Sequence, residues 1–142
     1  MAIIPIQLDA IREKRGAVLS LELSKEFGLS IVDAVLHTTK KGEKRGGHYH
    51  PRESGKVEVF VPLVGVAKLL WHDTSAPDKT YEELMHPIFQ NEGMVYRVEP
   101  ETCHQVVGES ELDFMMIELS SAVYLGKRDP DCEHGLRVDR RQ

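Results

Sequence analysis

Apolar residues fall in short runs along the chain, and these runs are rich in Val, Ile, Leu and Phe. Gly and Pro interrupt the runs often, and few windows keep the 3.6-residue period of a helix. Short runs of β-branched and aromatic residues between turn-forming residues are typical of strands. The pattern predicts strands at residues 17–22, 31–38, 57–63, 66–72, 94–98, 105–107 and 112–119. Such a series of short strands indicates an all-β sandwich or barrel.

The segments between these strands are polar and rich in turn-forming residues. They comprise a charged, Gly-rich turn at 40–47, loops at 51–56 and 73–79, a helical turn at 24–28 and a connection at 81–92 that is extended around 84–89. A polar, charged tail covers about 127–142 and is expected to be loosely held. Because no repeat or linker divides the chain, we expect a single domain over 1–142.

Composition narrows the range of partners. The chain has 142 residues and a formal net charge of −5, so a general attraction to nucleic acid is not expected. No apolar run approaches the length of about 18 residues that a membrane span needs, and the N-terminus lacks the features of a signal peptide. Cys103 and Cys132 are too few for a disulfide framework, so we expect a reduced cytoplasmic protein. Cys103 beside His104 would also suit a redox sensor, although a cysteine next to a turn histidine is usually inert.

Four residues form a candidate metal site. His48 and His50 are two apart, so in a strand both side chains point to the same face. Glu58 opens an apolar run, where a carboxylate is costly to bury unless it is paired or binds a metal. His104 follows a turn and leads into a strand. Three imidazoles and a carboxylate suit one divalent ion, whether Zn, Mn, Fe, Ni, Co or Cu, and leave positions open for substrate.

Each member of this set also has a simpler role open to it. A pair of histidines two residues apart is more often exposed or hydrogen-bonded than metal-bound. Glu58 could instead form an ion pair with Lys56 or Lys68. His104 could instead be a turn residue whose ring is hydrogen-bonded to the backbone. Only the joint spacing of the four residues therefore supports a metal site.

That joint spacing resembles the motifs of the cupin superfamily, the RmlC-like jelly rolls. The matching residues are Gly46, Gly47, His48, His50, Glu58 and Gly65 for the first motif, and Gly93, Pro100 and His104 for the second. The resemblance covers about residues 40–119. It implies an all-β, single-domain cupin β-barrel, also called a double-stranded β-helix or jelly roll. It also implies that His48, His50, Glu58 and His104 are the metal ligands.

The chain departs from these motifs in three places. The loop between His50 and Glu58 is longer than usual, and Glu53 within it is a rival ligand, although the spacing to the glycine that ends the motif favours Glu58. Pro62 inside a strand suggests an edge or a bulge. Glu101 stands where a glycine is usual, so the turn before His104 is not expected to use a positive φ at that residue.

A narrower resemblance concerns Arg15-Gly16 and the sequence KGEKRGGHYH at residues 41–50. Both are similar to cupins of nucleotide-sugar and polysaccharide biosynthesis, including 3,4-ketoisomerases and 3,5-epimerases of deoxysugars. The resemblance implies an enzyme that moves a proton next to the ketone of a nucleotide-linked sugar. It also implies a homodimer, with the Arg-Gly segment shared between subunits. Residues 3–6 are a second candidate interface strand, unless they pack on their own barrel.

Further residues are assigned roles within this hypothesis. Tyr96 and Glu99 precede His104 and are candidate catalytic residues, although Tyr96 also suits the core. Arg45 and Arg52 flank the histidine pair and are candidate diphosphate ligands, although Arg52 also suits a solvated loop. Phe60 is a candidate substrate contact. If all three histidines bind metal, the sequence offers no obvious base.

Two other functions use the same residues. An Fe(II) dioxygenase would take the same ligands and leave positions for O₂, within an apolar pocket. A non-catalytic cupin would bind a small ligand without turnover. The sequence does not separate these from the isomerase or epimerase hypothesis.

Overall fold

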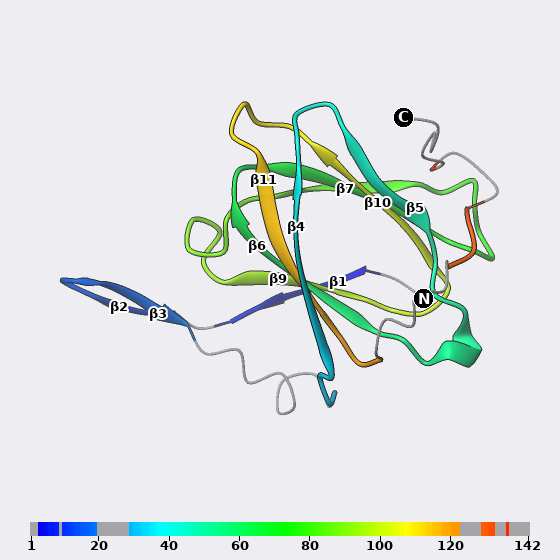
Figure 1. Ribbon diagram of the computed structural model, residues 1–142, viewed down its shortest axis with the longest axis horizontal. Coiled ribbons are helices and arrows are strands. Elements are labelled where there is room, and N and C mark those ends of the chain that lie inside the picture. Colours follow the sequence, from blue (N-terminus) through cyan, green and yellow to red (C-terminus); the bar gives the residue numbers. More distant parts are fainter. Residues whose placement is uncertain (1–2, 9, 20–28, 123–128, 133–135, 137–142) are drawn as a thin grey trace.

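Two antiparallel sheets pack face to face in the computed structural model, which describes residues 3–8, 10–19, 29–122, 129–132 and 136 (Figure 1). One sheet contains, in order, β1 (Ile3–Gln7), β9 (Met94–Val98), β6 (Glu58–Val64), β11 (Phe114–Ser120) and β4 (Asp33–Thr39). The other contains β5 (Lys44–His48), β10 (Thr102–Gly108), β7 (Ala67–Asp73) and β8 (Tyr81–Met85). A hairpin of β2 (Ala10–Glu13) and β3 (Gly16–Leu19) stands away from the barrel. No helix among these residues has the length and apolar character needed to cross a membrane.

The predicted strands correspond to β3, β4, β6, β7, β9, β10 and β11, and 94–98 matches β9 at both ends. The end of the first one, residues 20–22, lies outside the described residues, as does the expected turn at 24–28. The structure corrects two assignments. Residues 44–48, expected in a turn, form β5 on a sheet edge, and the 81–92 connection begins with strand β8, earlier than its expected extended part. The first was missed because charged, exposed side chains and glycines on an edge strand give no apolar period.

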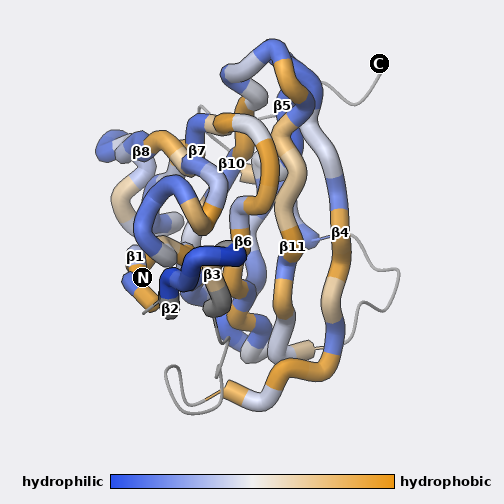
Figure 2. The backbone as a smooth tube through the Cα atoms, turned by 90° about the vertical axis from the view of Figure 1, so that its left-hand side faces the viewer, coloured by the Kyte–Doolittle hydropathy of each residue, from blue (hydrophilic) through white to orange (hydrophobic). Residues whose placement is uncertain are grey.

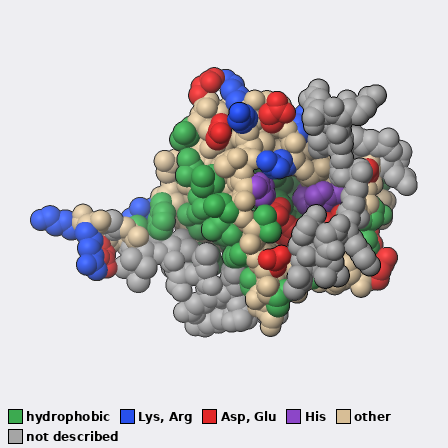
Figure 3. Space-filling model, viewed as in Figure 1, with side chains coloured by type: hydrophobic (Ala, Val, Ile, Leu, Met, Phe, Trp, Pro, Cys, Tyr) green, Lys and Arg blue, Asp and Glu red, His purple; other side chains and the backbone are tan. Residues whose placement is uncertain are grey.

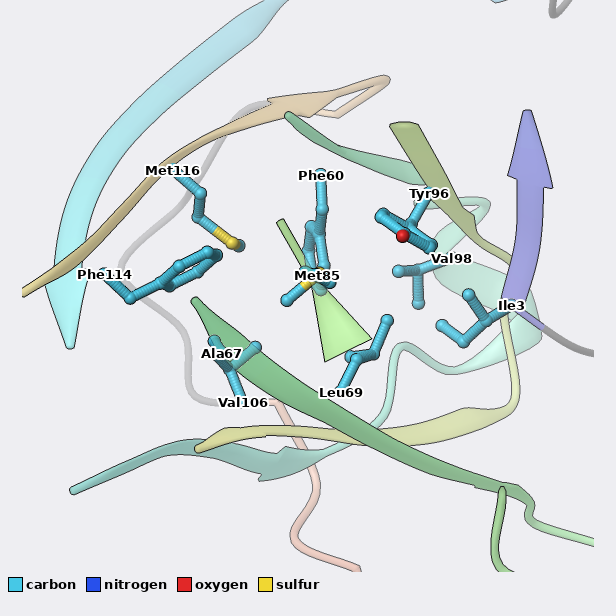
Figure 4. Close-up of a cluster of buried hydrophobic side chains, with 10 residues drawn as sticks. All are labelled: Ile3, Phe60, Ala67, Leu69, Met85, Tyr96, Val98, Val106, Phe114 and Met116. Atoms are coloured by element: carbon cyan, nitrogen blue, oxygen red, sulfur yellow. The ribbon is translucent and has the colours of Figure 1, made fainter. Parts of the chain in front are cut away.

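The main core lies between the two sheets. Figure 4 shows Phe60, Phe114, Met85 and Met116 converging there from three strands, β6, β8 and β11. A smaller cluster covers the other face of the five-stranded sheet, where Val59 packs with other apolar side chains. Strand β6 is therefore buried on both faces, which explains why its apolar run shows little polar alternation. Burial of a side chain the size of Phe60 contributes about 2 kcal/mol.

Strand β1 belongs to this chain's own barrel. It pairs with β9 from Ile3↔Val98 to Gln7↔Met94, so residues 3–6 form the intramolecular strand that was the alternative to an interface. The hydropathy-coloured trace in Figure 2 shows the opposite edge of the same sheet, where β4 lies beside β11.

Pro62 lies at an irregularity in the sheet, as its sequence context predicted. The register between β6 and β11 shifts between Met115 and Met116, and Met116 is the partner of Pro62. On the other side, β6 pairs with β9 only from Glu58 to Phe60. Pro62 therefore lies beyond the last residue that pairs with β9, and its missing N–H removes no ladder bond there.

Glu101 contradicts the expectation for the turn before β10, because its φ is 61°. The residue is held there by its own hydrogen bonds. Its N–H donates to the His50 carbonyl at 2.8 Å, and its carbonyl accepts from the Thr74 amide at 3.0 Å. Its carboxylate accepts from the Arg52 amide at 3.1 Å and from the Thr74 hydroxyl at 3.1 Å. These four bonds offset a backbone strain of about 1 kcal/mol.

Gly46 is expected to be essential for the packing of β5 against β10. A Cβ at this position would lie 2.6 Å from the His104 carbonyl oxygen, and its φ is +92°. We expect Gly46→Ala to lower the free energy of unfolding by about 2–4 kcal/mol, from φ strain plus overpacking. Gly42→Ala is the control, because Gly42 has φ +79° but no atom near such a Cβ. Urea denaturation measures both, and equal losses would contradict the steric argument.

Candidate functional site

Four residues from three parts of the barrel meet at one open end. His48 is the last residue of β5 and lies opposite His104 in the register of β5 with β10. His50 lies two residues beyond the end of β5, outside the strand. Glu58 is the first residue of β6, in the other sheet. The sheets thus bring together residues separated by up to 56 positions (104 − 48).

The three histidines form a compact cluster. One ring nitrogen from each lies within 4.8 Å of the corresponding atoms of the other two. The ring centroids are 5.6 Å apart for His48 and His50, 4.8 Å for His48 and His104, and 5.1 Å for His50 and His104. His50 and His104 are buried, with 0% and 2% of their surface exposed, whereas His48 is half-buried. His48 is therefore the most exposed of the three histidines.

Several polar atoms of this cluster have no hydrogen-bond partner among the described residues. The Nδ1 atom of His104 lies 2.9 Å from the Thr102 carbonyl, which makes Nδ1 the protonated nitrogen and leaves the Nε2 lone pair directed inward. That Nε2 is buried without a partner, as are both ring nitrogens of His50 and one oxygen of Glu58. Buried polar atoms without partners are rare in proteins and call for a ligand.

Glu58, and not the rival Glu53, lies beside the histidines. Its Oε1 atom is 2.5 Å from His50 Nε2 and 3.6 Å from Lys56 Nζ, and the residue is 2% exposed. Glu53 is exposed in the 3-10 turn η1 (Arg52–Ser54). The three imidazoles lie close enough together to share one divalent ion, and Glu58 approaches this group at His50.

Burial lowers the pKa of two imidazoles of this cluster, His50 and His104. Desolvation lowers the pKa of His104 to about 3, with His48 and His50 acting in the same direction. Desolvation likewise lowers the pKa of His50 to about 4, although the charge of Asp129 opposes the shift. Neutral imidazole is the form that binds metal or accepts a proton.

These pKa shifts predict an acid-sensitive fold for the metal-free protein. An unfolded chain protonates both histidines near pH 6.5, whereas the folded chain resists this until about pH 4 or below. Stability is therefore full above pH 6.5 and decreases by several kcal/mol as the pH falls through this window. Urea denaturation with a chelator present measures the slope. A His50→Gln, His104→Gln variant is expected to show a shallower slope, and an identical slope would contradict the assignment.

Two adjacent cavities, each of about 190 Å³, meet at His48 and Glu118. The first is lined by His37, Arg45, Gly46, His48, Phe60, His104, Val106 and Glu118. The second is lined by Asp33, Val35, His48, Lys56, Glu58, Glu118, Ser120 and Asp129. Figure 3 shows histidine side chains in a hollow of this face, beside acidic and basic groups. The histidine cluster is thus accessible to a small polar ligand.

His37 and Glu118 form a second acid–base pair on the wall of the first cavity. His37 on β4 and Glu118 on β11 approach to 3.4 Å between Nε2 and Oε1, and His37 Nδ1 is buried without a partner among the described residues. Sequence reasoning missed both residues. The available signal was a charged Glu118 inside the apolar run of 112–119, the same kind of signal that identified Glu58.

Of the other five residues that the sequence suggested for catalysis or substrate binding, two line a cavity and three do not. Arg45 and Phe60 line the first cavity, and Arg45 Nε donates to the Thr38 carbonyl at 2.6 Å. Arg52 lies in η1 and lines neither cavity. Tyr96 belongs to the core, where burial raises its pKa to about 12. Glu99 pairs with Arg97 at 2.7 Å, and neither Tyr96 nor Glu99 lines either cavity.

The cysteines correct another expectation from the sequence. Cys103 and Cys132 form a disulfide bond, with Cα atoms 6.0 Å apart, and are not free thiols. The bond joins β10 to the C-terminal segment, and residues 129–132 of the predicted loose tail lie against β5. The tail was misjudged because its backbone bonds to β5 leave no trace in hydropathy, and its few buried side chains, Cys132 and Leu136, stand among polar and charged residues.

Comparisons with solved structures identify the fold. The 3,4-ketoisomerase QdtA from Thermoanaerobacterium thermosaccharolyticum, in complex with TDP, superposes with a TM-score of 0.73 at 19% identity, over 86% of this chain and 82% of that one. The TDP-quinovose 3,4-ketoisomerase WlaRB from Campylobacter jejuni gives 0.76 at 17% identity, over 91% and 92%. The 4-keto-6-deoxy sugar epimerase NovW from Streptomyces spheroides gives 0.69 at 16%, over 86% and 64%.

At these identities the likeness establishes the fold. Neither a protein-family model nor a curated protein matches the sequence. The chain thus has the cupin β-barrel, the RmlC-like jelly roll, that its two motifs predicted.

Proposed function

We propose that this chain is an isomerase or epimerase of a nucleotide-linked keto-sugar, acting by proton transfer next to the ketone. The observation that carries the proposal is a cluster of three histidines, two of them buried, that lies at a cavity beside Arg45. Solved structures of the same fold include enzymes described as TDP-sugar ketoisomerases and a keto-sugar epimerase. Neutral imidazoles next to carboxylates are suited to moving protons near pH 7.

The proposal includes one divalent ion held by His48, His50 and His104, with Glu58 as the carboxylate ligand. The ion would act as a Lewis acid toward the ketone oxygen when bound. The donor set does not select among Zn, Mn, Fe, Ni, Co and Cu.

His37 supplies the base that the ligand set lacks. It lines the cavity with His48 and His104 but belongs to a separate pair with Glu118. In the proposed step, His37 takes the proton from the hydroxyl-bearing carbon next to the ketone. The electrons of the C–H bond form a C=C bond and those of the C=O bond move to oxygen, which gives an enediolate. To move the ketone, the proton of the neighbouring hydroxyl passes to this oxygen, the C=O bond forms at the neighbouring carbon, and His37 returns its proton to the former ketone carbon. Protonation of the original carbon on its opposite face by water, whose hydroxide then takes the proton from His37, gives the epimer instead. Glu118 stabilises the protonated His37 between these events.

Arg45 is placed to receive the nucleotide part of the substrate. It lies exposed at the edge strand β5, and its Nε bond to the Thr38 carbonyl orients the guanidinium plane at the cavity. A guanidinium donates hydrogen bonds in a fork that matches a diphosphate. The sugar would then extend from this rim toward His48.

Solvent deuterium exchange tests the proposal. TDP-4-keto-6-deoxyglucose incubated with the protein in D₂O should gain deuterium next to the ketone, as seen by mass spectrometry and ¹H NMR. The His48→Ala, His104→Ala variant is the matched control. Oxygen uptake without exchange would favour an Fe(II) dioxygenase, and tight binding of TDP without either reaction would favour a non-catalytic binding protein. Either result contradicts the isomerase or epimerase assignment.

We further propose a homodimer that uses the hairpin β2–β3 and the β4 edge. The hairpin stands off the barrel in Figure 1, and Leu36 and Val32 near the free edge are 60% and 54% exposed. Exposed apolar side chains on an unpaired edge strand favour association with a second copy. Analytical ultracentrifugation of the wild type and of a Leu36→Glu variant tests this, with a monomer expected only for the variant.

A further inference from the structure

The C-terminal segment runs along the strand that carries His48. Residues 129–132, here called the strap, follow the edge of β5 and form a bridge between His48 and Asp131. The Tyr49 amide donates to the Pro130 carbonyl at 3.2 Å, and the Cys132 amide donates to the Gly47 carbonyl at 2.9 Å. The strap thereby acts as an additional strand on an edge that would otherwise be unpaired.

The strap brings a carboxylate to the histidine site. Asp129 Oδ2 lies 3.5 Å from His50 Nε2, on which Glu58 also converges. Asp129 lines the second cavity with His48 and Lys56. It is the one described residue of the C-terminal segment that lines either cavity.

Buried covalent and apolar contacts hold the strap in place. The disulfide joins Cys132 to Cys103, the residue before His104, and both cysteines are buried together with Leu136. The side-chain amide of Gln105 donates to the Leu136 carbonyl at 3.2 Å. Tyr49 packs against the same cluster. The strap is therefore bound to both strands: to β5 by backbone hydrogen bonds and to β10 by the disulfide.

We propose that the strap completes the histidine site, with Asp129 as a positioning residue for His50 and with the Cys103–Cys132 disulfide as the lock that holds the strap on β5. The inference deepens the proposed function, because it concerns the same cavity. It adds that the site depends on the redox state of two cysteines outside the ligand set.

The redox step is an exchange with a dithiol. The two sulfurs of the dithiol join in a new S–S bond while the Cys103–Cys132 bond breaks, and one hydrogen passes to each Sγ atom. A ring nitrogen of His72 and both Sγ atoms lie within 4.8 Å of one another, so an imidazole stands beside the thiols that form. Opening the bond removes the covalent link between the strap and β10, so we expect the strap to leave β5 more often.

The test follows the strap and His50 separately, without substrate. Amide hydrogen exchange at Tyr49 and Cys132 reports strap docking, and long-range ¹H–¹⁵N NMR reports the His50 ring. Dithiothreitol should raise exchange at both amides about tenfold or more and shift the His50 ring signals. Asp129→Asn should shift those signals while both amides stay protected. Asp78→Asn, the same change in an exposed turn, is the control.

Turnover adds a readout that a purely structural role would not affect. In the deuterium exchange assay, Asp129→Asn should lower kcat about tenfold with little change in KM, and Asp129→Glu should restore part of it. Protected amides and unchanged ring signals after reduction would overturn the lock. Wild-type ring signals in Asp129→Asn, or an unchanged kcat, would overturn the positioning role. Absence of turnover in every form, by contrast, contradicts the proposed function and leaves the NMR result to decide the strap.

Discussion

A His48→Ala, His104→Ala variant is expected to bind no divalent metal and to retain no more than about a thousandth of the wild-type turnover. The reason is geometric. Removal of two of three imidazoles that lie within 4.8 Å of one another leaves His50 and Glu58 alone, which is too few ligands for a stable site. Metal analysis of the purified proteins and the deuterium exchange assay measure the two losses.

The control for this prediction is His86→Ala, which removes an exposed histidine from the loop after β8. It should keep both metal and turnover. Thermal unfolding in the presence of a chelator provides a second check, because metal binding to the folded state adds to its stability. A wild-type protein that contains no metal and is equally stable with and without divalent ions would contradict the metal site.

A His37→Asn variant is expected to lose about a hundredfold to ten-thousandfold in turnover while keeping its metal. His37 is the cavity imidazole that lies outside the ligand cluster, and Glu118 pairs with it at 3.4 Å. Asn preserves polarity and approximate size but accepts no proton at neutral pH. The initial rate of deuterium uptake and the metal content, measured on the same preparation, separate loss of the base from loss of the ion.

Glu118→Gln is expected to lower turnover less than His37→Asn does. The amide keeps the shape of the side chain but no longer stabilises a protonated His37, so we expect a loss of about tenfold. His37→Asn with wild-type turnover would remove His37 from the mechanism. Loss of metal in that variant would show instead that His37 belongs to the ligand cluster.

The histidine cluster could be predicted from the sequence because the features that indicate it lie close together in the chain. His48 and His50 share a face at any strand position, and Glu58 keeps a fixed spacing to the glycine that ends its motif. The structure places all three beside His104. A buried carboxylate at the start of an apolar run is costly enough that its presence indicates a partner.

The roles of His37 and Asp129 could not be predicted from the sequence in the same way. Each reaches the site through pairing between segments far apart in the chain, β4 with β11 and the strap with β5. One sequence contains no information on which strands become neighbours. The disulfide was missed for a similar reason, since Cys103 and Cys132 are 29 residues apart and only the strap brings them together.

The turn at Glu101 links two of the chain's departures from the cupin motif. The loop from His50 to Glu58 is longer than the motif, and a longer loop costs more entropy to close. Glu101 bonds the carbonyl of His50 at one end of that loop and the amide of Arg52 within it. A glycine would adopt the same φ without strain but would lack the carboxylate that binds the loop. Any graft of this motif onto another barrel should therefore transfer the loop and the glutamate together, as a single module.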